Sequence, residues 1–304
     1  MPTLHQEKIN FYNNPSIDGL MRCCAVDTWH RIKFCQSHPA SHLHETTITQ
    51  NIVYEFLQME EAELLQVTVF ESNDEKATGS DLEIILRSDS FFVRFVVQAK
   101  KIGRQLKYEQ FHHTAGGVPQ IDRLLKHAEK TNSIALYLFY NYSDDRVLNK
   151  AIADGWELPI DYFGCSFANA RALYQAYYRS LKPPVPGFPD VHRAILAYPF
   201  EQMGYFTRLD FLDNYLKTFG DASPLGNYAC QPTAQQSLQD SKNWHRLIRR
   251  GATIGRIGPD THHKEFPVEF ISQQHPVFLP SETGAGEPAF MPLYRIEIDL
   301  DSYG

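Results

Sequence analysis

The sequence predicts an α/β protein in which helices flank a mixed β-sheet, and three observations support this class. Residues 41–141 carry a helical pattern, three strand-like runs, a second helical pattern and a buried strand, in that order. The run LYRIEIDL at residues 293–300 alternates apolar and charged side chains, as a strand does. The chain has 304 residues, of which 43% are hydrophobic and 21% charged, and this length suits one large domain or two smaller ones. A disulfide-stapled miniprotein, a fibre and a disordered tail are excluded.

The elements of the predicted core follow from local patterns. A first helix is expected over residues 41–65, where Leu43 begins a row of apolar side chains at helical spacing and Ser41 can serve as the cap. Three strands are expected next, at residues 65–72, 81–88 and 91–99. The short link between the last two predicts a hairpin. A helix at residues 120–130 and a buried strand at 133–141 complete the core.

Further elements are expected beyond the core: a helix at residues 166–180, a strand at 194–200, and helices at 211–219 and 235–250. The segment 182–190 has four prolines in nine residues and is predicted to be an extended connector. The expected organisation is an N-terminal extension (1–40), the core (41–182) and a C-terminal α+β region (191–304) that could pack on the same sheet.

The charge pattern bears on the partner and the compartment. The formal charge of −7 argues against a surface built for non-specific nucleic-acid binding, yet residues 94–107 and 242–256 each hold five basic residues and no acidic one. The five cysteines are scattered, which suits reduced thiols.

No run of the sequence approaches the roughly 18 apolar residues of a membrane span, and the N-terminus lacks the basic-then-apolar order of a signal peptide. We therefore expect a cytoplasmic protein with no membrane segment.

Polar residues at two strand ends indicate a catalytic site. Because side chains alternate along a strand, Asp81 and Glu83 share one face, as do Gln98 and Lys100. Pairing of these strands as a hairpin would bring the four side chains together at one end of an otherwise apolar sheet, where charges are costly unless they pair or bind a cation. Adjacent carboxylates are suitable ligands for Mg²⁺ or Mn²⁺, and a nearby ammonium group can orient a water molecule. A structural ion cluster at the sheet edge is the alternative.

The motifs resemble a known family. Glu45 in the first helix, GSDLE at residues 79–83 and VQAK at residues 97–100 resemble the PD-(D/E)XK nuclease superfamily, in its Mrr-like restriction endonuclease variant with a QxK motif. The resemblance covers roughly residues 40–142 and implies a restriction-endonuclease-like core. It implies that Asp81 is the principal metal ligand, that Gln98 takes the usual acidic position, that Lys100 is the catalytic lysine and that Glu45 assists the metal from the helix.

The neutral Gln98 departs from the charged ligand of the wider superfamily and should weaken metal affinity, although Mrr-like members share it. Strand alternation indicates that Glu83 could restore the lost charge, and the main-chain carbonyl of Ala99 would complete the site for Mg²⁺ or Mn²⁺. The resemblance implies metal-dependent hydrolysis of phosphodiester bonds, most simply by a DNA endonuclease, and by analogy a role in bacterial defence. The rival expectation is an inactive nuclease fold that serves as a binding or scaffold module.

Residues that follow the motif lysine are expected to bind nucleic acid. They are Lys101, Arg104, Lys107 and Tyr108, which could contact phosphates or stack on a base. Cleavage of two strands often uses two active sites, so a homodimer fits this function. The Cys- and His-rich segment 23–44 could instead hold zinc, although it has no CxxC pair.

Overall fold

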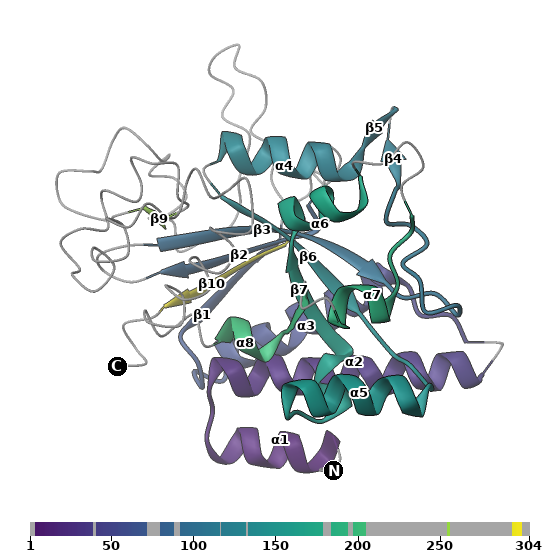
Figure 1. Cartoon of the computed structure of the whole chain (residues 1–304). Coiled ribbons are helices and arrows are strands. Elements are labelled where there is room, and N and C mark those ends of the chain that lie inside the picture. Colours follow the sequence, from purple (N-terminus) through teal and green to yellow (C-terminus); the bar gives the residue numbers. More distant parts are fainter. Residues whose placement is uncertain are drawn as a thin grey trace, which may run out of the picture.

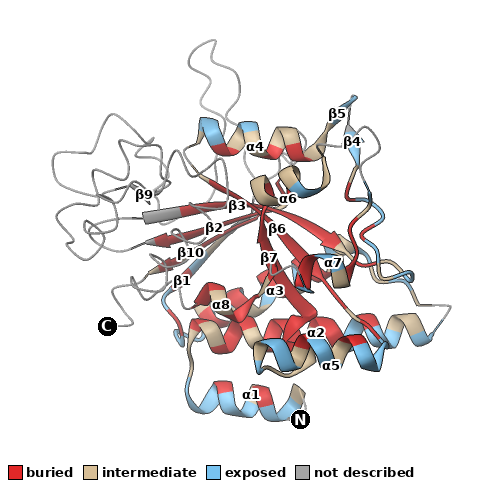
Figure 2. Ribbon diagram, in the orientation of Figure 1, coloured by how far each residue is buried: buried red, intermediate tan, exposed pale blue. Residues whose placement is uncertain are grey.

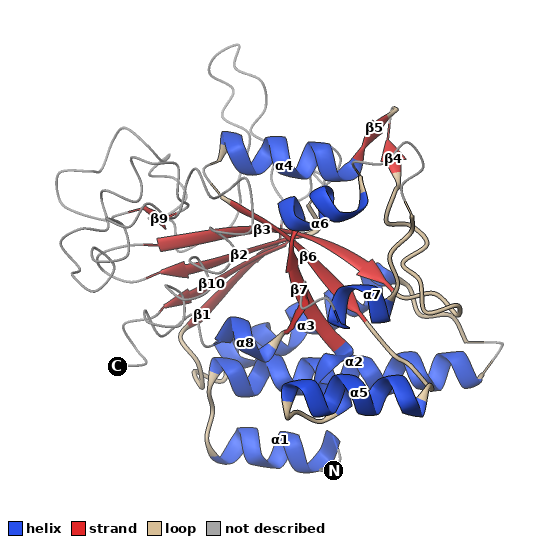
Figure 3. Cartoon of the chain, in the orientation of Figure 1, coloured by secondary structure: helices blue, strands red, loops and turns tan. Residues whose placement is uncertain are grey.

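A mixed β-sheet with helices on both faces forms the centre of the chain (Figure 1, Figure 3), so the predicted α/β class is confirmed. The computed structural model describes residues 4–38, 41–71, 80–87, 92–115, 117–131, 133–178, 184–193, 197–204, 254–255 and 294–299. No helix within these ranges is long and apolar enough to cross a membrane.

The described sheet has the strand order β1-β10-β2-β3-β6-β7-β8, with β9 paired to the start of β3. Its strands are β1 (Val67–Glu71), β10 (Tyr294–Asp299), β2 (Leu82–Arg87), β3 (Phe92–Lys101), β6 (Ile134–Tyr140), β7 (Cys165–Asn169), β8 (Ala197–Pro199) and β9 (Ile254–Gly255). The β10–β2 and β3–β6 pairs are parallel, and the other pairs are antiparallel. A separate short hairpin joins β4 (Thr114–Ala115) to β5 (Val118–Pro119).

Two layers of helices cover the sheet (Figure 1). One face carries α4 (Gln120–Lys130) and α6 (Ala170–Tyr177), and the other carries α2 (Ile17–Ser37) and α3 (Glu45–Glu61), with α1 (Leu4–Asn13) and α5 (Arg146–Trp156) further out. The remaining helices are η1 (Ile160–Gly164), α7 (Phe188–Arg193) and α8 (Glu201–Gly204). The central strands and the inner faces of the helices are buried, while α1 exposes its outer face (Figure 2).

The core elements occur in the predicted order α3, β1, β2, β3, α4 and β6. The predicted hairpin is the antiparallel β2–β3 pair, in which Ile84 lies opposite Phe95. The cap is different from the one expected, because α3 begins at Glu45 after His44, whose side chain makes no capping hydrogen bond. Ser41 lies too far from this helix start to cap it, and its hydroxyl instead lies 3.2 Å from the Cys35 sulfur.

The prediction of a helix over residues 166–180 is wrong for residues 166–169. Residues Cys165–Asn169 form the buried strand β7, and the helix α6 begins only at Ala170. The Asn169 side chain caps it by accepting from the main-chain N–H groups of Arg171 at 2.9 Å and Ala172 at 3.2 Å. An Asn cap marks a helix start, and this signal outweighs the helical spacing that precedes it.

The residues expected as an N-terminal extension contribute a helix to the common core. Helix α2 buries eleven residues, including Met21 and Ala25, and packs on η1, α8, α1 and β7. The approach is so close that a Cβ atom on Gly164 would lie 1.9 Å from the Ala25 main-chain oxygen. Gly164 therefore permits the contact between η1 and α2.

The strand expected at residues 293–300 is β10, and it lies between β1 and β2 in the same sheet. One wet face was expected, but Arg295 on that face is only 3% exposed and its guanidinium pairs with the buried Glu83 of β2. The helices expected at residues 211–219 and 235–250 lie outside the described residues, as does nearly all of the second basic strip.

Candidate functional site

Asp81 lies just before the start of β2, beside the second half of β3. Its main-chain N–H donates to the Val97 oxygen at 2.8 Å, which ties the residue to the neighbouring strand just before β2 begins. Its carboxylate atom Oδ2 accepts from the Ala99 N–H at 2.8 Å and from Nε2 of Gln98. The hairpin thus fixes this carboxylate beside the QAK motif, as the sequence predicts.

Lys100 and Glu45 form the second half of the site. The Lys100 side chain is only 4% exposed, and its Nζ lies 3.6 Å from Oε1 of Glu45. The other carboxylate oxygen of Glu45 accepts from the Lys101 N–H at 2.7 Å. A nearly buried ammonium group needs such a partner, because an unpaired charge away from water is costly.

The start of α3 is anchored to the end of β3 by these contacts. Lys101 adds a further link, because its Nζ donates to the Leu43 main-chain oxygen at 2.6 Å, just before the helix. The structure therefore brings Glu45 to Lys100 across 55 residues of sequence. Glu45 remains 25% exposed, so this end of the sheet keeps contact with solvent.

The amide of Gln98 lies between Asp81 and Ala99. Its Nε2 donates to Asp81 Oδ2 and, at 3.1 Å, to the main-chain oxygen of Ala99. The residue is 1% exposed, and its Oε1 is buried without a hydrogen-bond partner among the described residues. A buried oxygen of this kind calls for a ligand, an ion or a water molecule.

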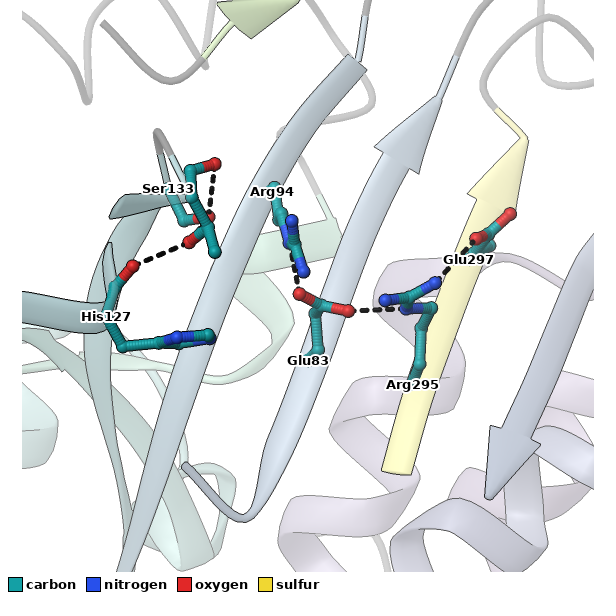
Figure 4. Close-up of polar contacts among 7 residues, drawn as sticks. Glu83, Arg94, His127, Ser133, Arg295 and Glu297 are labelled. Carbon is teal, nitrogen blue, oxygen red and sulfur yellow. Dashed lines mark hydrogen bonds and ion pairs between the residues drawn. The ribbon is translucent and has the colours of Figure 1, made fainter. Parts of the chain in front are cut away.

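Glu83 does not join this site, contrary to expectation. It is fully buried on β2, and its two carboxylate oxygens pair separately with Arg94 of β3 and Arg295 of β10 (Figure 4). Burial alone would raise the pKa of Glu83, but the two arginine charges and their hydrogen bonds outweigh burial and hold it below its usual value. Both oxygens are used by the arginines, so Glu83 is not available as a metal ligand in this arrangement.

Tyr108 also differs from the expectation that it stacks on a base. Its ring is fully buried, and its hydroxyl donates to Oδ1 of Asn141 at 2.6 Å. The residue instead anchors the loop after β3, because its main-chain N–H donates to the Pro186 oxygen at 3.0 Å. The same loop exposes Arg104 and Lys107 to solvent.

Comparison with known proteins gives one family. Residues 18–201 match DUF6615, described as a family of unknown function. The chain belongs to the DUF6615 family. The matched part includes the four site residues Glu45, Asp81, Gln98 and Lys100 and stops before β10. No curated protein matches this DUF6615 chain.

Zinc binding by the Cys- and His-rich segment finds no support in the described part of the DUF6615 chain. Within it, no three His, Cys, Asp or Glu side chains gather as a metal site. Cys23 and Cys24 lie buried in α2, and burial raises the pKa of the Cys23 thiol to about 12.

Tyr137 is a site neighbour that sequence reasoning missed. It lies on β6 directly opposite Gln98 in the parallel pairing, is fully buried, and has a hydroxyl without a hydrogen-bond partner among the described residues. Burial raises the pKa of Tyr137 well above its usual value, and the charges of Asp81 and Glu45 add to this effect. The only sequence signal is a tyrosine in a strand of otherwise apolar residues, which is common in cores and points to no site by itself.

Proposed function

We propose that this DUF6615 chain is a metal-dependent phosphodiesterase that cleaves nucleic acid, with DNA as the expected polymer and a restriction-endonuclease-like core. The observation that carries the proposal is the grouping of four separate motif residues at one end of β3: Asp81 with Gln98, and Glu45 with Lys100. A nearly buried lysine paired with a partly exposed carboxylate is an expensive arrangement for a purely structural role.

The donor atoms present suit a hard divalent cation. Asp81, Oε1 of Gln98 and the main-chain oxygen of Ala99 would hold Mg²⁺ or Mn²⁺, and the buried, unpartnered Oε1 supports this assignment. A cation bound there would supply Lewis-acid stabilisation of the charge on the scissile phosphate. The set contains a single carboxylate, so we expect weak, millimolar-range affinity.

The residues of the chain would share the remaining work. Lys100 would orient the attacking water and contribute positive charge beside the phosphate, while Glu45 would fix the Lys100 side chain through their ion pair. Arg104 and Lys107 are exposed on the loop that follows β3, where their charges would bind backbone phosphates without reading sequence. Cutting both strands of a duplex would take two such sites, as in a homodimer.

An inactive scaffold is the second candidate. It is favoured by the neutral Gln98 and by the lack, within the described residues, of three acidic or metal-binding side chains around one point. The two functions differ in their response to cations, because a ligand that binds the native state raises its stability with occupancy. A melting temperature that stays constant from zero to 20 mM Mg²⁺ or Mn²⁺, roughly the concentration needed to fill a weak site, would favour the scaffold.

The decisive experiment is cleavage of plasmid, linear duplex DNA, single-stranded DNA and RNA in Mg²⁺ and in Mn²⁺. Lys100→Met and Asp81→Asn are compared with Lys150→Met and Asp154→Asn, which make the same changes in an exposed ion pair on α5. We expect the first two variants to lose at least about a hundredfold in rate, because they remove groups that act on the reacting phosphate. The α5 variants should cut like the parent.

Equal cutting by all four variants would show that the activity lies elsewhere or comes from a contaminant. Absence of cutting in every preparation, together with a melting temperature that ignores both cations, would leave the scaffold as the better function. The ratio of nicked to linear plasmid products as a function of protein concentration reports whether two copies act together.

A further inference from the structure

The amide of Gln98 faces Asp81 with the wrong atom for a cation site. Its nitrogen, Nε2, occupies the position where Oδ2 of Asp81 and the main-chain oxygen of Ala99 converge. Two oxygens that face one point require a donor between them when no cation is present, and the N–H groups of an amide supply it. A cation at the same point would need oxygen lone pairs from all three groups.

A rotation of about half a turn around the last side-chain bond of Gln98 exchanges Oε1 for Nε2 at nearly the same positions, because the two ends of an amide have almost the same shape. Resting on the function proposed above, we propose that Gln98 is a two-state gate for the cation. In the cation-free state its nitrogen closes the site by bonding Asp81, and cation binding turns the amide so that Oε1 joins Asp81 and Ala99 as a ligand.

The unpartnered oxygen supports this gate. In the cation-free orientation Oε1 is buried with no hydrogen-bond partner among the described residues, at a side chain only 1% exposed. Neither orientation therefore satisfies every polar atom without help: one lacks a partner for Oε1 and the other needs a cation. A cation that binds only the rotated arrangement shifts the amide toward that arrangement as the site fills.

The adjoining strand has a polar atom on the same register position, but it is not hydrogen-bonded to the Gln98 amide in the cation-free orientation. Tyr137 lies opposite Gln98 in the β3–β6 register, and its buried hydroxyl has no partner in the described part of the chain. A carboxylate in place of Gln98 would need no rotation and would add a negative charge. The gate thus explains how a glutamine can serve at this position while making cation binding weaker and conditional.

The first test measures Mn²⁺ binding to the full chain by calorimetry, with Gln98→Glu, Gln98→Met and the charge-matched control Gln58→Glu, which lies in α3. Gln98→Glu should bind Mn²⁺ at least about tenfold more tightly than the parent, because it adds charge and needs no amide rotation. Its cation-free melting temperature should fall, since two carboxylates then face each other, and Mn²⁺ should restore it. Gln98→Met should bind more weakly, and Gln58→Glu should match the parent.

The second test observes the amide directly. The NMR signal of the Gln98 side-chain NH₂ group is assigned by its loss in Gln98→Met. In the parent this signal should shift on titration with diamagnetic Mg²⁺, because the hydrogen bond from Nε2 to Asp81 breaks. In Asp81→Asn the same titration should leave the Gln98 signal unchanged. The gate is overturned if the parent binds Mn²⁺ while Gln98→Glu binds no tighter and Gln98→Met binds equally well, a result that leaves the proposed hydrolysis intact. Failure of every variant, including Gln98→Glu, to bind either cation would overturn the gate and the metal-dependent function together.

Discussion

Replacement of Arg295 by methionine should destabilise the fold strongly, because it breaks the buried charge cluster of Glu83, Arg94, Arg295 and Glu297 (Figure 4). The two arginines and two carboxylates cancel in charge. Methionine keeps the length and the apolar character of the side chain but leaves Oε2 of Glu83, which is fully buried, without its partner.

The magnitude follows from burial. Loss of one partner from a buried ion pair costs about 3–5 kcal/mol, and the remaining bond to Arg94 argues for the lower end of this range. A loss of about 3 kcal/mol corresponds to a decrease of roughly 6 °C in melting temperature for a chain of this size. The matched control is Arg171→Met, which breaks an ion pair with Glu129, whose side chain is 62% exposed, and should cost about 1 kcal/mol or less.

Urea unfolding followed by circular dichroism measures both variants. The cost should also depend on pH: the pKa of Glu83 is held below its ordinary value of 4.5, so its paired carboxylate stabilises the fold above that pH and stops doing so as the pH falls through the lower, folded-state value. The difference between parent and Arg295→Met should therefore shrink as the pH falls below 4.5. A difference within 1 kcal/mol of zero at pH 7 would refute the reasoning.

Three further substitutions test single contacts by the same unfolding measurement. Tyr137→Phe removes a buried hydroxyl without a partner in the described residues and should leave stability equal or up to about 1 kcal/mol higher, so a clear loss would reveal an unseen partner. Tyr108→Phe removes the donor to Asn141 and should cost about 1–3 kcal/mol, and no change would mean that this bond does not hold the loop. Burial raises the pKa of Glu201 from 4.5 to about 7. Between these two pH values the carboxyl group is protonated in the folded chain and ionised in the unfolded chain, so the stability of the fold decreases as the pH rises through this window. Glu201→Gln should remove this fall of roughly 3 kcal/mol, and an unchanged profile would show that Glu201 is not its source.

The core elements were predictable because their signals are local. Periodic apolar residues define α3 and α4, and the runs of β-branched and aromatic residues define β2, β3 and β6. The grouping of Asp81, Gln98 and Lys100 also followed from local spacing, since a hairpin and strand alternation place these residues together. The boundaries deviated by a few residues, as at the start of α3.

The role of Glu83 could not be predicted, because its partner Arg295 lies 212 residues away. Alternation in β10 indicated one wet face, and no local signal indicated that the arginine on that face would be buried in an ion pair with Glu83. The prediction that Tyr108 stacks on a base was wrong for a similar reason. An aromatic residue beside basic ones has the same sequence pattern whether it lies in the core or faces a ligand.

The position of β10 makes one side of the sheet depend on contacts between residues that are far apart in the sequence. Val67 of β1 pairs with Ile298 of β10, and β10 in turn pairs with β2, whose first residue directly follows Asp81. Contacts of such long sequence separation form late and slowly during folding. During synthesis β2, the strand that begins after Asp81, therefore has one open edge until the residues of β10 have left the ribosome, and only then can β10 connect β1 to the rest of the sheet.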